Sequence, residues 1–122
     1  MNFLAHIYLS FGNEGITLGN FIADRIKGNK YDHLPQMVQK GIRLHREIDT
    51  YTDTHPIPRK SSKRLHKNYS HYSRVIVDIY YDHFLAKNWE RYSDIPLPIF
   101  TDRFYDLLED NYTLLPEGIQ RM

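Results

Sequence analysis

The spacing of the apolar residues most constrains the fold of this chain, because it follows a helical period wherever a period is visible. Five segments carry an apolar stripe of this kind, at about residues 3–11, 17–27, 35–52, 72–92 and 100–108. No segment alternates apolar and polar residues with the period of two that is typical of a half-buried strand. The sequence therefore predicts an all-α protein, a helical bundle forming a single domain over residues 1–122.

Glycine and proline fall between these segments and predict where the helices end. Pro56 and Pro58 lie in the stretch 54–58, where each proline disfavours the helical conformation of the residue before it and lacks a donor N–H. We therefore expect a linker at 54–58, followed by a polar stretch. A Pro-rich turn is expected at 94–98, and the tail 112–122 resembles the start of another element.

Composition limits the chemistry that the chain can carry. It has no cysteine, which excludes disulfides, thiolate metal sites and a cysteine nucleophile, so any metal must be held by histidine and carboxylate. The first basic residue is Arg25, and no apolar run approaches the roughly 20 residues of a membrane span. We expect a cytoplasmic protein with no membrane association.

Ionisable residues lie on the apolar face of the third predicted helix. With successive residues about 100° apart, Val38, Ile42 and Ile48 fall in one arc, and His45 and Asp49 fall in the same arc. Their i, i+4 spacing lets both side chains reach one ligand. A hydrogen bond between a buried histidine and an aspartate is the alternative interpretation of this pair.

The segment 75–86 shows the same feature more strongly. Its apolar side chains point in every direction, which predicts a helix buried on all sides. Asp78, Asp82 and His83 interrupt it. A buried carboxylate without a partner costs several kcal/mol, so each needs a cation or a donor network. Either a shared divalent metal or an ion-pair network with Arg or Lys satisfies this requirement.

Two more residues extend the set, since Asp24 and His6 project away from the apolar stripes of their own segments. If the helices pack together, seven side chains converge on one pocket: His6, Asp24, His45, Asp49, Asp78, Asp82 and His83. Imidazole with carboxylate suits Mn, Mg, Fe or Zn. The other histidines lie in polar or linker segments and are assigned no role.

A basic segment separates Asp53 from Asp78. No acidic residue lies between them, and six Lys and Arg residues do: Arg59, Lys60, Lys63, Arg64, Lys67 and Arg74. Such a strip steers an anionic partner toward the protein, although a solvated helix face is the alternative. Tyr69 and Tyr72 supply little of the interleaved stacking that RNA binding needs, so no nucleic acid is expected.

Four blocks of sequence carry a resemblance to a known family, in order and at family-like spacing over nearly the whole chain. The blocks are MNFLAHIYLS at residues 1–10, GNFIAD at 19–24, GIRLHREID at 41–49 with Thr52-Asp53, and DIYYDHFL at 78–85. Together they resemble acyl carrier protein phosphodiesterase, also called acyl carrier protein hydrolyase.

The resemblance implies a metal-dependent, all-helical phosphodiesterase, a divergent relative of the HD phosphohydrolases, that removes 4′-phosphopantetheine from holo-acyl carrier protein. Manganese is the metal implied. We expect the metal to be bound by Asp24, His45, Asp82 and His83, with His6 as general acid and Asp49 and Asp78 as orienting or second-metal residues. The basic segment would dock the acidic carrier protein through Arg59, Lys60, Lys63, Arg64 and Lys67.

The chain resembles the N-terminal part of a longer family member, so further C-terminal helices are expected and activity of the shorter form is in question. Apolar faces left uncovered would favour a homodimer or a domain swap. Two other functions stay open: an HD-like phosphohydrolase acting on a nucleotide or another small phosphodiester, and a non-catalytic scaffold that binds carrier protein.

Overall fold

In the part that the computed structural model describes, residues 3–69 and 72–120, all regular secondary structure is helical and no strand occurs. This agrees with the predicted all-α class. The elements are α1 Phe3–Tyr8, α2 Glu14–Ile22, η1 Ala23–Arg25, α3 Gln36–Thr54, α4 Pro56–Tyr69, α5 Ser73–Lys87, η3 Trp89–Arg91, α6 Leu97–Asp110, η4 Tyr112–Leu114 and α7 Glu117–Gln120.

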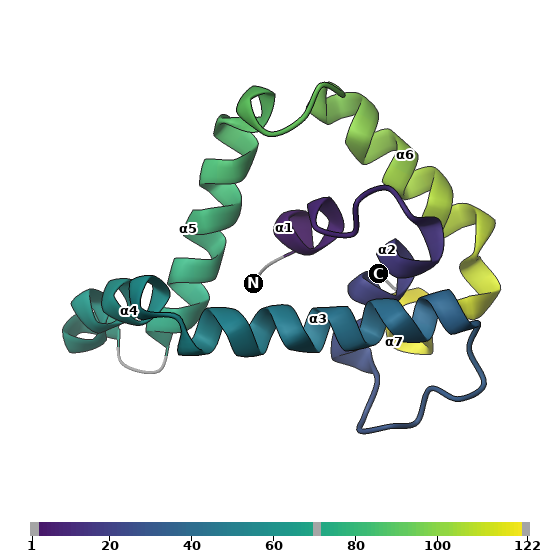
Figure 1. Ribbon diagram of the computed structural model, residues 1–122, viewed down its shortest axis with the longest axis horizontal. Helices are drawn as coiled ribbons and strands as arrows, with labels where there is room; N and C mark the ends of the chain where they lie inside the picture. Colours follow the sequence, from purple (N-terminus) through teal and green to yellow (C-terminus); the bar gives the residue numbers. More distant parts are fainter. Residues whose placement is uncertain (1–2, 70–71, 121–122) are drawn as a thin grey trace.

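Three helices form a frame around the N-terminal part of the chain (Figure 1). Helix α3 is one side of this frame, α5 rises from the end of α3 that leads into α4, and α6 returns toward the beginning of α3. Helices α1 and α2 lie inside the frame, with α2 against α3. Segments that are far apart in sequence are thereby brought around α1.

Glycines allow α2 and α3 to approach closely. A Cβ added to Gly19 or to Gly41 would lie 2.9 Å from the Cα of the other glycine, and a Cβ on Gly41 would also lie 2.9 Å from the backbone nitrogen of Asn20. Each added Cβ would fall even closer to a backbone carbonyl of the facing helix. Larger side chains at these two positions would therefore push the helices apart.

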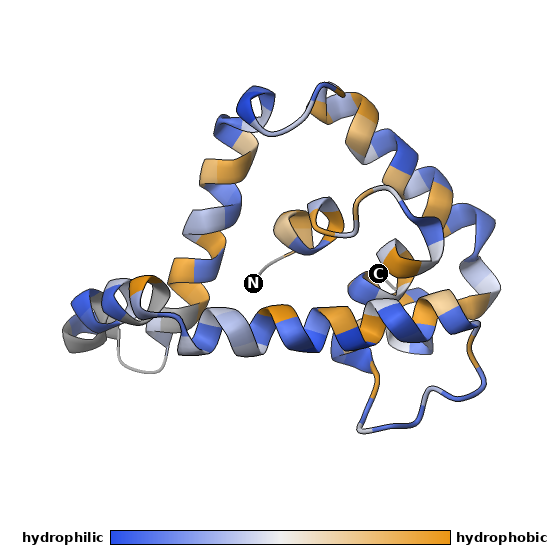
Figure 2. Cartoon of the chain, viewed as in Figure 1, coloured by the Kyte–Doolittle hydropathy of each residue, from blue (hydrophilic) through white to orange (hydrophobic). Residues whose placement is uncertain are grey.

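The hydrophobic core lies where α2 and α3 meet the C-terminal helices. Leu18, Ile22 and Ile42 are buried at its centre, and Leu107 of α6 and Ile119 of α7 close it from the other side. Hydrophobic and hydrophilic residues alternate along α3 and α6, as expected for helices with one face on this core (Figure 2).

The predicted linker at 54–58 is wrong, because α4 begins at Pro56. Only His55 separates α3 from α4, and it adopts an extended conformation (φ −71°, ψ 139°), as the residue before a proline should. A proline in the first helical turn removes an N–H that has no partner within the helix, so Pro56 starts the helix rather than preventing it.

The prediction that residues 75–86 are buried on all sides is also wrong. Val75, Ile79, Tyr80 and Phe84 are each about half exposed, along one face of α5. The opposite face contacts α1, so the uniform apolar pattern combines one packed face with one open face. An open apolar face is what the predicted homodimer or domain swap requires, and dimerisation stays a prediction.

We expect Gly41→Ala to lower the free energy of unfolding by about 1–3 kcal/mol, because the added methyl group overpacks the contact between α2 and α3. Urea denaturation followed by circular dichroism measures this. Gly118→Ala is the matched control, since its Cβ would lie at an ordinary 3.6 Å from the nearest atom, on Arg25. Equal stabilities of the two variants would contradict the close approach.

Candidate metal centre

Two buried histidines from different helices lie face to face. His6 of α1 is 2% exposed and His45 of α3 is 5% exposed. Their ring centroids are 3.9 Å apart and their planes differ by 11°. Two positively charged imidazoles would repel each other strongly at this distance, so the pair needs neighbouring negative charge.

Carboxylates supply that charge from two directions. Asp49, one turn after His45 on α3, places Oδ1 at 3.2 Å from Nε2 of His6 and Oδ2 at 3.2 Å from Nε2 of His45. Asp24 of η1 places Oδ1 at 3.1 Å from Nε2 of His45. Four predicted site residues are therefore brought together by α1, η1 and α3.

Asn20 fixes the proton position on His45. The Nδ1 atom of His45 lies 2.8 Å from the backbone carbonyl oxygen of Asn20 and 3.2 Å from its side-chain Oδ1, both acceptors, so Nδ1 carries a proton and donates it. In neutral His45, Nε2 then presents a lone pair to two carboxylates. This arrangement is stable only with a cation at Nε2, either a proton or a metal ion.

His6 differs from His45 in its second nitrogen. Nδ1 of His6 is buried without a hydrogen-bond partner among the described residues. Histidine ligands of metals usually donate the other ring N–H to an acceptor, as His45 does to Asn20. The contacts therefore suit His45 as a ligand and suit His6 as a group that holds a proton on Nε2 and donates it to Asp49.

The pKa values of the site reflect these contacts. Burial of His45 opposes its protonation, but the hydrogen bond and charge of Asp49, the charge of Asp24 and the bond to Asn20 together raise its pKa above 6.5. Partial burial of Asp49 favours its neutral form, and the hydrogen bonds of His45 and His6 outweigh this, so its pKa lies well below the usual range. The Asp49 carboxyl is therefore ionised at neutral pH.

The three predicted site residues of α5 have different surroundings. Asp78 is half-buried, and burial raises its pKa, with the charges of Asp49, Asp53 and Asp82 adding to the effect. Asp82 accepts hydrogen bonds from the backbone of α1, at Leu4 N (3.0 Å) and Ala5 N (3.1 Å).

His83 is exposed, and the structure does not bring it to the histidine pair. Adjacent residues of a helix project about 100° apart, which separates His83 from Asp82. The ligand roles of Asp82 and His83 stay predictions, without support from these contacts.

The predictions from sequence missed two residues of this centre, Asn20 and Ser10. Asn20 is fully buried, and its amide nitrogen donates to the carbonyl oxygen of His6 (2.8 Å) and to Oγ of Ser10 (3.1 Å). Nothing in the apolar period of α2 marks Asn20. The one sequence feature that could have pointed to Asn20 is Gly19 before it. A glycine that allows two helices to approach closely also buries the residue next to it, whatever that residue's polarity.

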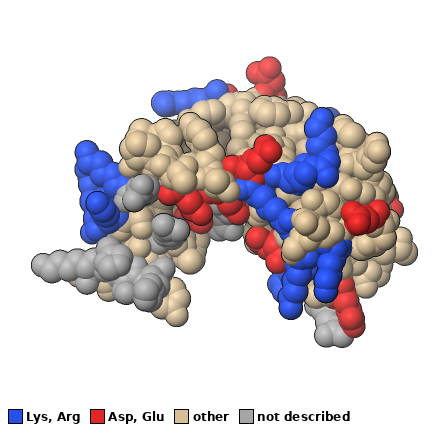
Figure 3. Space-filling view, turned by 60° about the horizontal axis from the view of Figure 1, so that its bottom comes forward, with Lys and Arg blue, Asp and Glu red and all other residues tan. Residues whose placement is uncertain are grey.

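Charge is distributed unevenly around the centre (Figure 3). Lys and Arg side chains gather at the α4 end of the molecule, Asp and Glu side chains line the hollowed band beside it, and the opposite flank carries side chains of both charges. An anionic partner would be attracted to the α4 end, and a cation to the band.

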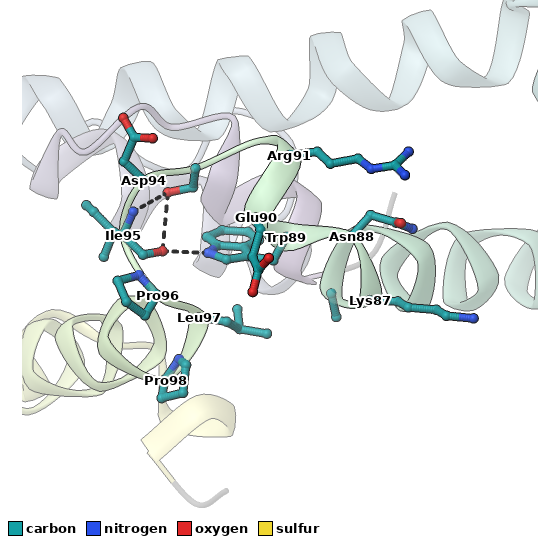
Figure 4. Close-up of a pocket in the computed structure, with 12 residues that line it drawn as sticks. Lys87, Asn88, Trp89, Glu90, Arg91, Asp94, Ile95, Pro96, Leu97 and Pro98 are labelled. Carbon is teal, nitrogen blue, oxygen red and sulfur yellow. Dashed lines mark hydrogen bonds between the residues drawn. The ribbon is translucent and has the colours of Figure 1, made fainter.

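A separate pocket of about 530 Å³ lies where α5 leads into α6 (Figure 4). Trp89 donates its indole N–H to the carbonyl oxygen of Ile95 across it (2.7 Å). None of the seven predicted site residues lines this pocket, so it is distinct from the histidine centre.

Comparison with known proteins identifies the family. A family model described as "Acyl carrier protein phosphodiesterase" matches residues 1–122. The chain belongs to the acyl carrier protein phosphodiesterase family. The resemblance noted in the sequence is thereby confirmed.

Curated relatives carry the same family name. The chain is 37% identical over 86 residues to the acyl carrier protein phosphodiesterase of Yersinia pestis, covering 70% of this chain and 45% of that protein. It is 38% identical over 86 residues to that of Photorhabdus laumondii, covering 70% and 43%. The matched region thus spans less than half the length of these relatives.

No solved structure matches the chain significantly. Among the residues that the structure describes, no helix is long and apolar enough to cross a membrane.

The raised pKa of His45 predicts a pH dependence of stability in metal-free protein. A histidine whose pKa is higher in the folded state stabilises the fold fully below its unfolded pKa and loses that contribution as pH rises through the folded value. We therefore expect unfolding free energies measured in EDTA to fall as pH rises above about 6.5.

His45→Gln should abolish this fall, whereas replacement of the exposed His33 by Gln should leave it unchanged. An identical pH profile for wild type and His45→Gln would show that His45 is not coupled to the two carboxylates.

Proposed function

We propose that this chain is a metal-dependent phosphodiesterase that hydrolyses the bond between 4′-phosphopantetheine and the serine of holo-acyl carrier protein. The observation that carries the proposal is the convergence of two carboxylates on Nε2 of His45, whose Nδ1 donates a hydrogen bond to the carbonyl oxygen of Asn20. Family membership supports the substrate.

The donor set fits a divalent cation. One ring nitrogen each of His6 and His45 and a carboxylate oxygen of Asp49 lie within 4.8 Å of one another, and the carboxylate of Asp24 contacts Nε2 of His45. We propose that His45, Asp24 and Asp49 hold the metal. Manganese is our proposed ion, since imidazole and carboxylate ligands without sulfur suit it, as they suit magnesium, iron or zinc.

A metal here would supply Lewis-acid stabilisation of charge on the phosphodiester and would help to ionise a water molecule. The remaining steps fall to the protein. In its imidazolium form, His6 donates the Nε2 proton to the serine oxygen as the bond from phosphorus to that oxygen breaks, while the attacking water loses a proton to solvent and its oxygen bonds to phosphorus. Asp49 orients His6 by accepting that N–H in the resting protein.

Asp78 is proposed as an auxiliary carboxylate of the same centre. Its raised pKa arises from burial and from Asp49, Asp53 and Asp82, so it shares the electrostatic field of the site. An orienting role, or a role in binding a second metal, follows from that position.

We predict that Asp24→Ala and His45→Ala each lower kcat by at least about 100-fold, because each removes a proposed ligand. Conversion of holo- to apo-acyl carrier protein with Mn²⁺, followed by intact-protein mass spectrometry, measures this. The control is Asp32→Ala, which removes an exposed carboxylate outside the centre. Full activity of both site variants would contradict the assignment.

We further propose that the basic face of α4 docks the carrier protein. Lys60, Lys63 and Arg64 are exposed on α4, whereas the side chains of Arg59 and Lys67 lie outside the described part of the chain. Ser61 and Ser62 bond to Tyr81 and Ser73 of α5, so the three cations lie on faces of α4 that do not contact α5. Carrier proteins are acidic, which makes this face complementary to them.

Reversing the charge at Lys60, Lys63 and Arg64 should reduce kcat/KM for holo-acyl carrier protein by at least about tenfold, because electrostatic attraction acts on association. Hydrolysis of a small chromogenic phosphodiester should change little. The same reversal at the exposed Lys27, Lys30 and Lys40 is the matched control.

An equal loss on both substrates would favour the alternative of a nucleotide or another small diester as the natural substrate. An equal effect of the control triple variant would remove α4 as the docking face.

A further inference from the structure

Helix α1 is too short to be stable by itself. It has six residues, and isolated helices under about 12 residues are marginal in water. Its position must therefore be set by tertiary contacts, and the exact place of His6 depends on them. The contacts at the two ends of α1 are made by side chains from other elements.

The first end is held by α5. The N–H groups of the first helical turn have no partner within a helix. The carboxylate of Asp82 accepts hydrogen bonds from two of them, with Oδ2 at 3.0 Å from Leu4 N and Oδ1 at 3.1 Å from Ala5 N. Both oxygens of Asp82 are thereby occupied in holding α1, one residue before His6.

The second end is held by α2. The carbonyl of His6 itself accepts from the amide nitrogen of Asn20 (2.8 Å) and from the hydroxyl of Ser10 (2.9 Å). The other N–H of the Asn20 amide donates to Oγ of Ser10 (3.1 Å). Both amide hydrogens of a fully buried side chain are thus used on α1 and the turn that follows it.

The same Asn20 also holds His45. Its backbone carbonyl and its Oδ1 both accept from Nδ1 of His45, at 2.8 and 3.2 Å. One residue therefore fixes the backbone of one histidine and the ring of the other, and the two rings stack at 3.9 Å. The close contact of Gly19 with Gly41 places Asn20 where it can do so.

We propose that Asn20 and Asp82 are positioning residues that clamp the two ends of α1 and so set the stacking of His6 on His45. This inference rests on the proposed function for its catalytic meaning, and it assigns Asp82 a role other than the metal ligand expected from sequence. A geometric error of about 1 Å at an acid catalyst costs up to about 100-fold in rate, which is why the clamp matters.

The test is nuclear Overhauser contact between the ring protons of His6 and His45, measured on the full chain in EDTA. Asn20→Ala and Asp82→Ala should each weaken this contact strongly. Asp82→Asn keeps an acceptor oxygen and should retain most of it. Ile22→Ala is the matched control, because it removes a buried side chain of α2 that packs in the hydrophobic core, and it should leave the ring contact intact.

Two measurements with Mn²⁺ complete the test. In Asp82→Asn the calorimetric affinity for Mn²⁺ should stay within about threefold of wild type, because the change removes no proposed ligand. In Asn20→Ala it should fall by no more than about tenfold, because the backbone carbonyl of residue 20 still accepts from Nδ1 of His45 when the side-chain acceptor is lost. In Asn20→Ala kcat for holo-acyl carrier protein should fall at least about tenfold, with KM little changed. If an alanine variant does not fold, Ser10→Ala removes one of the two Asn20 amide bonds and should weaken the ring contact partially.

Unaltered ring contact in Asn20→Ala, or in Ser10→Ala where that variant replaces it, would overturn the clamp. Loss of Mn²⁺ binding in Asp82→Asn with the ring contact preserved would overturn the role given to Asp82 and return it to the ligands. If wild-type protein neither binds Mn²⁺ nor hydrolyses the carrier protein, the proposed function fails, and the ring contact still decides the clamp by itself.

Discussion

The close approach of α2 and α3 is the constraint on which the rest of this structure depends. With glycine at positions 19 and 41, the two backbones come within contact of each other, and Asn20 reaches the ring of His45. Because this contact also buries Asn20, its amide must find partners, and it finds them on α1. A backbone contact made without polar side chains therefore determines where both histidines lie.

Electrostatics then decides what the centre can bind. His45 donates through Nδ1 to a carbonyl that can only accept, which leaves Nε2 facing Asp24 and Asp49. In the absence of a metal this nitrogen binds a proton more readily than that of an ordinary histidine, since the two carboxylates raise the pKa of His45. A divalent cation would satisfy the same three atoms, so protonation and metal binding compete for one position, as is usual for histidine ligands.

The sequence predicted the helical class from the helical period of five segments, and it predicted the pairing of His45 with Asp49 from the period of one of them. It also selected His6 and Asp24, whose convergence depends on packing that a helical period does not contain. The contact of Asp82 with α1 could not be predicted from the sequence, since a carboxylate that caps another helix looks the same in sequence as one that binds a metal. Helix α4 was missed because Pro56 was interpreted as a helix breaker, although it starts the helix.

The exposed face of α5 shows a related limit. A continuous apolar pattern predicts burial only if something covers each face, and Val75 and Ile79 are about half exposed here. Family membership was recognisable because three of the four motif blocks contain the residues that meet at the centre: His6, the segment from Asn20 to Asp24, and the segment from Gly41 to Asp49. Those blocks combine residues that pack the helices together with the histidines and aspartates of the centre.

Anomalous diffraction from crystals grown with Mn²⁺ tests the central claim most directly. The account predicts an anomalous peak at bonding distance from Nε2 of His45 and from the carboxylates of Asp24 and Asp49, with Nδ1 of His45 still directed at the carbonyl of Asn20. A Mn²⁺ peak elsewhere on the chain, or no peak beside His45 at saturating Mn²⁺, would contradict it.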